Sequence, residues 1–113
     1  VTVKGYAYSG GGRDIARVEV SSDGGETWKT ATLQPRPECA GVPVKDKAAF
    51  QQKEWSWVLW SAAVPVPADA RQIDLCCKCV DVAYNTQPEK MSSIWNMRGL
   101  LSNAYHHVFV KRQ

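Results

Sequence analysis

The sequence contains no long apolar run, no block of like charges, no internal repeat and no low-complexity segment. A helix that crosses a membrane needs about 18 to 20 consecutive apolar residues, so we expect no membrane span. The net charge is only +3, and the lysines and arginines are scattered along the chain. Nucleic-acid-binding domains carry clustered basic residues, so a nucleic-acid partner is not expected either.

The sequence also lacks a signal peptide or transit segment. It opens directly on a strand-like stretch at residues 1–3. We therefore expect a domain from a longer chain whose targeting information lies elsewhere. The residues alone leave the compartment unknown, and the C-terminal residues 111–113 do not form a peroxisomal signal.

Cys76 and Cys79 have the C-x-x-C spacing, but the sequence has neither a second such pair nor the nearby histidine pair that would complete a zinc site. There are four cysteines in all, Cys39, Cys76, Cys77 and Cys79. In an extended run, Cys77 and Cys79 share one face and Cys76 lies on the other. We predict free, buried thiols that pack as small hydrophobic residues, and no metal site. Unpaired thiols fit a reducing compartment better than secretion.

The composition describes one packed domain over residues 1–113, because apolar residues make up 44% of the chain and charged residues 22%. Period-two alternation and turn residues indicate short strands, and no helical period is evident. The expected strands lie at residues 1–8, 15–20, 28–33, 55–64, 72–82 and 104–111. Together they predict an all-β fold, an immunoglobulin-like antiparallel β-sandwich.

Three segments carry more specific structural predictions. The Asp23-Gly24 pair is typical of a type I′ turn and predicts a tight hairpin. Residues 55–64 are apolar on both faces and predict a central strand covered on both sides, with tryptophans that favour a core or an interface over a carbohydrate platform. Residues 34–53 shift in composition towards prolines and then polar residues, and they predict a long surface insertion.

Arg98 is the one residue whose surroundings indicate chemistry. It follows Trp95 and Met97 in a stretch that is otherwise largely apolar. A guanidinium group that loses water in such surroundings needs an anionic partner. The spacing allows an internal salt bridge to Asp81 or Glu89. The alternative is an oxyanion ligand held by two parallel hydrogen bonds.

Six segments, taken in order, resemble the C-terminal dimerisation domain of the sulfite oxidase family of molybdenum-cofactor oxidoreductases. These segments are residues 3–13, 17–21, 23–29, 57–60, 81–88 and 94–102. They span nearly the whole chain apart from residues 34–53. That insertion is longer than is typical of the family, and residues 104–110 are less basic than the usual family ending.

The resemblance implies that a larger preceding domain holds molybdopterin-bound molybdenum through a cysteine thiolate and oxidises sulfite to sulfate. We therefore expect no catalytic residue, metal ligand or cofactor in this fragment, which should be inactive alone. The resemblance also implies a homodimer, in which this domain contacts its copy and the molybdenum domain. Arg98 matches the arginine that the domain adds to the sulfite- or sulfate-binding pocket. In the fragment we expect it to be exposed or paired with a carboxylate.

Two alternatives stay open. Assimilatory nitrate reductases of the same family share these motifs but typically lack an arginine at the position of Arg98. Because sulfite is dianionic, the more positive pocket favours sulfite oxidation. The other alternative is a free-standing immunoglobulin-like binding module that uses its tryptophans, for example on a carbohydrate. For the enzyme, the haem-containing branch of the family points to the mitochondrial intermembrane space.

Overall fold

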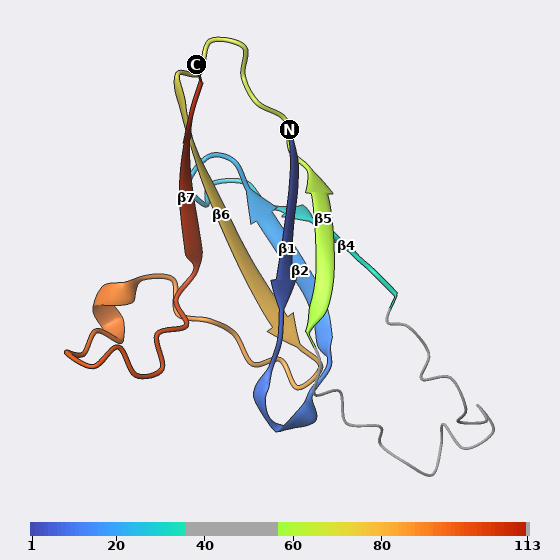
Figure 1. Cartoon of the computed structure of the whole chain (residues 1–113), viewed down its shortest axis with the longest axis vertical. Coiled ribbons are helices and arrows are strands. Elements are labelled where there is room, and N and C mark those ends of the chain that lie inside the picture. The colour runs from blue at the N-terminus through green and yellow to red at the C-terminus, as the bar shows by residue number, and fades with distance from the viewer. Residues whose placement is uncertain (36–56, 113) are drawn as a thin grey trace.

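The computed structural model describes residues 1–35 and 57–112, which form two antiparallel β-sheets without an α-helix (Figure 1). One sheet has the order β1-β5-β4, with strands β1 (Thr2–Ala7), β5 (Val58–Ala63) and β4 (Thr32–Leu33). The other has the order β3-β2-β6-β7, with strands β3 (Lys29–Thr30), β2 (Ile15–Ser21), β6 (Gln72–Asp81) and β7 (His106–Lys111). Two 3₁₀ turns are also present, η1 (Gly10–Gly12) and η3 (Met91–Ser93). The predicted all-β sandwich is thereby confirmed.

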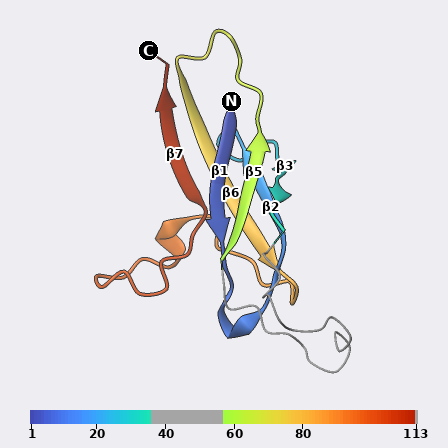
Figure 2. The ribbon, with the colours of Figure 1, turned by 45° about the vertical axis from the view of Figure 1, so that its right-hand side comes forward.

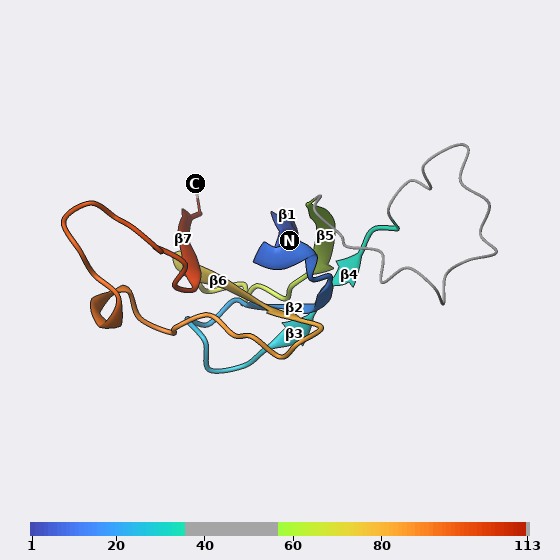
Figure 3. The same ribbon diagram turned by 90° about the horizontal axis from the view of Figure 1, so that it is seen from below.

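The two sheets form two layers with one apolar core between them. Figure 3 shows β1 and β5 in one layer and β6, β2 and β3 in the other. The core is built from inward side chains of β2, such as Val18 and Val20, and of β5, such as Val58 and Trp60. No helix among the described residues has the length and apolar content that a membrane crossing requires.

Gly5 is needed where β1 passes Trp60. The two residues face each other in the β1–β5 register. A Cβ atom at position 5 would overlap the indole ring of Trp60, so only glycine lets the ring lie against the strand. As a result the large side chain of Trp60 fills the core and is only 4% exposed.

The segment predicted as one strand at residues 28–33 is divided between the two sheets. β3 pairs with β2, whereas β4 pairs with β5. Ala31 lies at the crossing point, where it is buried and its backbone N–H donates a hydrogen bond to the carbonyl of Val18 at 2.8 Å. The prediction of a single returning strand is therefore wrong, because a change of layer leaves no mark in the alternation of side chains.

The connection from β2 to β3 is longer than the predicted two-residue hairpin. Gly24 and Gly25 do adopt positive φ angles, of 73° and 102°, as the Asp-Gly signal indicates. The carboxylate of Asp23, however, accepts hydrogen bonds from the backbone N–H groups of Glu26 and Thr27 at 3.1 and 2.9 Å. The side chain thereby replaces the cross-strand partners of a tight turn, and the loop widens.

β5 is the central strand of its sheet, as predicted, but only one of its faces is covered. Val58 and Trp60 point into the core, whereas Trp57 and Leu59 are 57% and 53% exposed on the other face. The prediction that both faces are covered is wrong for the described residues, since no further layer packs on the β1-β5-β4 sheet there. This sheet therefore presents a partly apolar outer face.

Some predictions fall on residues that the structure does not describe. The surface insertion at residues 34–53 lies outside the described residues apart from residues 34 and 35. Cys39 and Trp55 lie outside them as well.

Asp81 is the buried acceptor at which the loop after β1 meets the turn after β6. Its carboxylate accepts hydrogen bonds from Ser9 Oγ at 2.7 Å, from the backbone N–H of Ala83 at 2.9 Å and from the side-chain amide of Asn85 at 2.8 Å. Burial disfavours the charged form, but these hydrogen bonds outweigh it and hold the pKa of Asp81 at about 2. The carboxylate thus ties the loop after β1 to the turn that follows β6.

We expect Gly5→Ala to lower the free energy of unfolding by about 1–3 kcal/mol, because the added methyl group overpacks the core against Trp60. Gly10→Ala is the matched control, since a Cβ atom at position 10 meets no atom within 4 Å. Urea unfolding of both variants measures the difference. Equal stabilities for the two variants would contradict the close approach of β1 to Trp60.

We expect Asp81→Ala to lower the free energy of unfolding at neutral pH by about 2–3 kcal/mol, since buried donors lose their acceptor. The pKa of Asp81 lies below its ordinary value of 3.8, so this stabilisation is present above about pH 4 and is lost as the pH falls towards 2. The stability gap to the wild type should close over that window. Asp69→Ala, at an exposed carboxylate, is the control and should show no such gap.

Candidate functional site

The connection between β6 and β7 carries the candidate site and extends to the side of the sandwich, beyond β7 (Figure 1). Its two ends are held together by Gln87. The side-chain oxygen of Gln87 accepts a hydrogen bond from the backbone N–H of Cys79 at 2.8 Å, and its amide nitrogen donates to the carbonyl of Asn103 at 2.9 Å. The backbone N–H of Tyr105 also donates to the carbonyl of Pro88 at 3.1 Å. The base of the connection is therefore closed by hydrogen bonds.

Asn96 organises the tip of this connection. Its side chain donates to the carbonyl of Leu100 at 2.7 Å and accepts from the N–H of the same residue at 2.9 Å. Its carbonyl accepts from the N–H of Gly99 at 3.1 Å, and Gly99 has a φ of 66° that suits glycine. Arg98 is thus presented from a closed turn whose shape Asn96 determines.

Arg98 has no partner within the part of the chain that the structure describes. It is exposed and makes neither an ion pair nor a hydrogen bond there. The carboxylate of Asp81 is engaged by Ser9 and Asn85, so the internal salt bridge weighed from the sequence does not form. Glu89 forms no ion pair with Arg98 either. The guanidinium group is therefore available to an external anion.

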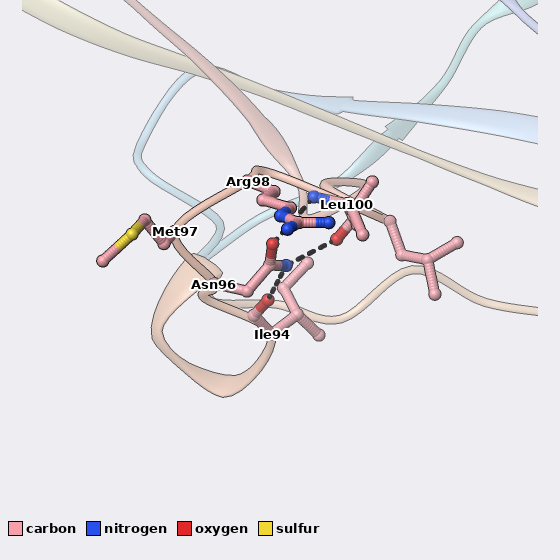
Figure 4. A pocket seen from close by; sticks show the side chains of 6 residues that line it. Ile94, Asn96, Met97, Arg98 and Leu100 are labelled. Carbon is pink, nitrogen blue, oxygen red and sulfur yellow. Dashed lines mark hydrogen bonds between the residues drawn. The ribbon is translucent and has the colours of Figure 1, made fainter.

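The turn around Arg98 forms an open hollow of about 530 Å³ (Figure 4). The residues that line it are Ile94, Asn96, Met97, Arg98, Leu100 and Leu101. Two of its apolar members are almost fully exposed, Met97 at 91% and Leu101 at 87%. Exposed apolar side chains grouped around a charged group are typical of a surface that meets another protein surface.

A second polar arrangement lies on the outer face of the four-stranded sheet. Nδ1 of His107 lies 3.0 Å from Oδ1 of Asp74, and Nε2 of His107 lies 3.4 Å from Sγ of Cys76. This thiol, imidazole and carboxylate lie in the order of a nucleophile, a base and an orienting acid. The sequence places Asp74 and Cys76 on one face of β6, but the register that brings β7 beside them has no sequence signal.

The protonation of the thiol decides what this second arrangement can do. Cys76 is 1% exposed, and its burial raises the pKa of the thiol to about 11. At neutral pH the thiol stays protonated, and its contact with His107 is a weak hydrogen bond. The arrangement therefore holds β7 against β6 and offers no nucleophile.

No residue group in the described ranges fits a metal or molybdenum cofactor. No cluster of three histidine, cysteine or acidic side chains that could hold a metal ion occurs there. Cys77 and Cys79 lie on the inner side of β6 against the core, as their alternation with Cys76 predicts, and burial raises the pKa of both thiols. A metal–thiolate bond needs the deprotonated form, which these sites disfavour.

Comparison with known proteins gives matches over nearly the full chain. The family model described as the Mo-co oxidoreductase dimerisation domain matches residues 1–113. The chain is 45% identical over 111 residues to mitochondrial sulfite oxidase of Mus musculus, a match that covers 98% of this chain and 18% of that protein. The chain thus spans about a fifth of the length of this curated relative.

Two further matches extend the comparison. The chain is 43% identical to inducible nitrate reductase [NADH] 2 of Glycine max, over 94% of this chain and 11% of that protein. Among solved structures, the sulfane dehydrogenase SoxCD from Paracoccus pantotrophus superposes with a TM-score of 0.68 and 25% identity, over 98% of this chain and 25% of that one. The same sandwich therefore occurs in oxidoreductases that bear different names.

We expect Cys76 in the native protein to react with iodoacetamide at neutral pH at least about tenfold more slowly than Cys79, because its thiol is buried and protonated. Unfolding in urea should remove the difference. Timed labelling and mass spectrometry measure both rates, since trypsin cleaves after Lys78 and separates the two cysteines. Faster labelling of Cys76 than of Cys79 would mean that His107 does activate the thiol.

Proposed function

The chain belongs to the Mo-co oxidoreductase dimerisation domain family, and we propose that it is the pairing domain of a sulfite-oxidising molybdenum enzyme. In this proposal residues 1–113 form one domain of a longer oxidoreductase. That parent enzyme binds its molybdopterin-bound molybdenum in another domain, since the described residues offer no ligand set for it. The supply of one substrate-binding residue, Arg98, is the chemical contribution of this domain.

The unpartnered guanidinium group of Arg98 carries the proposal. Asn96 and Gly99 hold it on a closed turn, and no described carboxylate neutralises it. When another domain covers the exposed Met97 and Leu101, water leaves the surroundings of the guanidinium group. Hydrogen bonds from a cation to an oxyanion strengthen in such a desolvated site. Arg98 can then orient a sulfite anion and balance its charge.

The choice between sulfite and nitrate depends on charge. The similarities to the mouse sulfite oxidase and to the soybean nitrate reductase are close, at 45% and 43% identity, so identity alone does not separate them. Sulfite carries more negative charge than nitrate and gains more from a guanidinium partner. Arg98, at a position where the nitrate reductases of the family typically lack an arginine, therefore favours sulfite as the substrate.

The partners and location follow from the same family. The domain contacts a second copy of itself in a homodimer, and it contacts the molybdenum domain of its own parent chain through the turn that holds Arg98. The mouse relative is named as a mitochondrial protein, which supports a mitochondrial location for the parent enzyme.

In the full-length parent enzyme, Arg98→Met should lower kcat/KM for sulfite by about 30- to 1,000-fold, mainly through a higher KM. The loss of one charge-assisted donor at a desolvated site is worth about 2–4 kcal/mol. Steady-state kinetics over a range of sulfite concentrations measures both constants. Arg98→Lys keeps the charge but not the planar fork, and it should recover part of the loss.

Arg17→Met is the matched control, because Arg17 is an exposed arginine whose only described ion pair is a surface contact with Glu19 at 3.5 Å. This control should leave KM for sulfite unchanged. An unchanged KM in Arg98→Met would rule out the substrate role of Arg98. A rate with nitrate that exceeds the rate with sulfite in the wild-type enzyme would favour the nitrate reductase alternative.

A further inference from the structure

We propose that Asn96 is a positioning and specificity-determining residue for the oxyanion site of Arg98. Its uncharged amide holds the turn in the shape that presents the guanidinium group. It does so without adding an anion that would neutralise that group. This inference rests on the proposed function, because it explains how the site assigned to Arg98 is kept open for sulfite.

The tip of the connection between β6 and β7 takes its shape from its own hydrogen bonds. The connection stands out from the two sheets in two views that differ by a turn of 45° (Figure 1 and Figure 2). None of the described residues 91–103 belongs to the apolar core. A segment without core packing is held by local contacts and opens more easily than the strands do. Contacts within the tip therefore decide whether the side chain of Arg98 starts from one backbone position or from many.

Asn96 closes the tip with a single amide group. The amide nitrogen donates to the carbonyl of Leu100 at 2.7 Å and to the carbonyl of Ile94 at 3.3 Å, and the amide oxygen accepts from the N–H of Leu100 at 2.9 Å. The backbone carbonyl of Asn96 also accepts from the N–H of Gly99 at 3.1 Å. Arg98 lies in the chain between these bonded residues, so a change in their bonds moves its backbone directly.

The backbone after Arg98 also depends on these bonds. Gly99 has a φ of 66° and Leu101 a φ of 54°. Positive φ is unfavourable for a residue with a branched side chain such as leucine, so the surrounding structure must hold it in place. The two bonds between the Asn96 amide and Leu100 hold the residue directly before Leu101. Without them Leu101 can relax to negative φ, and the turn then loses its present shape.

The neutral charge of the amide matters because Asn96 and Arg98 line the same hollow. Figure 4 shows the side chain of Arg98 directed back over the turn that Asn96 closes. A carboxylate at position 96 would have almost the same shape, but it would face the carbonyl oxygens of Ile94 and Leu100 without a proton to donate. It would instead be attracted to the guanidinium group and take the place of sulfite. The amide gives the same closure without that competition.

The first test measures steady-state kinetics of the full-length parent enzyme with Asn96→Ala. KM for sulfite should rise about tenfold with little change in kcat, because the binding-competent position of Arg98 becomes a minor population when these hydrogen bonds are lost. The inhibition constant of inorganic sulfate should rise by the same factor. An unchanged KM overturns the proposal.

Asn103→Ala is the matched control, because Asn103 lies in the same connection and its side chain makes no hydrogen bond among the described residues. Its backbone carbonyl, which accepts from Gln87, is kept in alanine. This control should leave KM and the inhibition constant of sulfate unchanged. A rise equal to that of Asn96→Ala would mean that any change in the connection weakens the site, and it would overturn the role of Asn96.

The variant Asn96→Asp tests the charge at nearly constant size. KM for sulfite should rise about 30-fold or more, beyond the rise in Asn96→Ala, because the new carboxylate pairs with Arg98. A smaller rise than in Asn96→Ala would overturn the specificity role, since the charge at position 96 would then not compete with sulfite.

A double variant separates an effect through Arg98 from a general loss of structure. Asn96→Ala/Arg98→Met should have a KM within about twofold of Arg98→Met alone, because the guanidinium group on which Asn96 acts is already absent. Urea unfolding of Asn96→Ala should match the wild type, since the tip adds nothing to the apolar core. A further rise of about tenfold in the double variant would overturn the positioning role.

The two proposals can fail separately. If Arg98→Met leaves KM for sulfite unchanged, the substrate role of Arg98 fails and the role of Asn96 fails with it. If Arg98→Met raises KM but Asn96→Ala and Asn96→Asp both match the wild type, only the role of Asn96 fails.

Discussion

The carboxylate of Asp81 is the interaction on which both the fold and the candidate site depend. It stands at the end of β6, where Ser9 arrives from β1 and where Asn85 begins the connection to β7. A buried charge of this kind is tolerated only because several donors replace its lost water. The same donors hold the turn in a shape from which the chain leaves the sandwich towards Arg98. Asp81 therefore fixes where the connection leaves the sandwich, while Gln87 closes its base and Asn96 shapes the turn that holds Arg98.

The two sheets bury one apolar core between them, but large apolar side chains stay exposed on two outer surfaces. Between the sheets, Gly5 and Trp60 show how closely the layers pack. Outside them, the turn around Arg98 and the face with Trp57 both expose large apolar side chains. A domain that worked alone would gain nothing from such exposure, which lowers solubility. Both surfaces therefore have the character of surfaces that contact another protein surface.

Alternation and turn residues predicted the class of fold because they act locally. Val18 and Val20 point inward two residues apart on β2, although an irregularity after Ile15 interrupts the alternation. Asp-Gly at residues 23 and 24 does supply the positive φ angle, at Gly24. The errors arise where one segment meets another. Residues 28–33 divide between sheets at Ala31, and Leu59 on β5 stays exposed because the number of layers is a property of the assembled fold.

The sequence by itself determined the β-sandwich class, the family and the residue most worth testing. An arginine among apolar neighbours needs an anionic partner wherever those neighbours become desolvated. Only the tertiary structure decided that Arg98 meets no described carboxylate and that Asn96 builds its turn. It also brought His107 beside Cys76, and it stacked Tyr6 on Trp57. Those contacts join residues far apart in the chain, and strand register, which sets them, results from packing of the whole domain and not from local propensity.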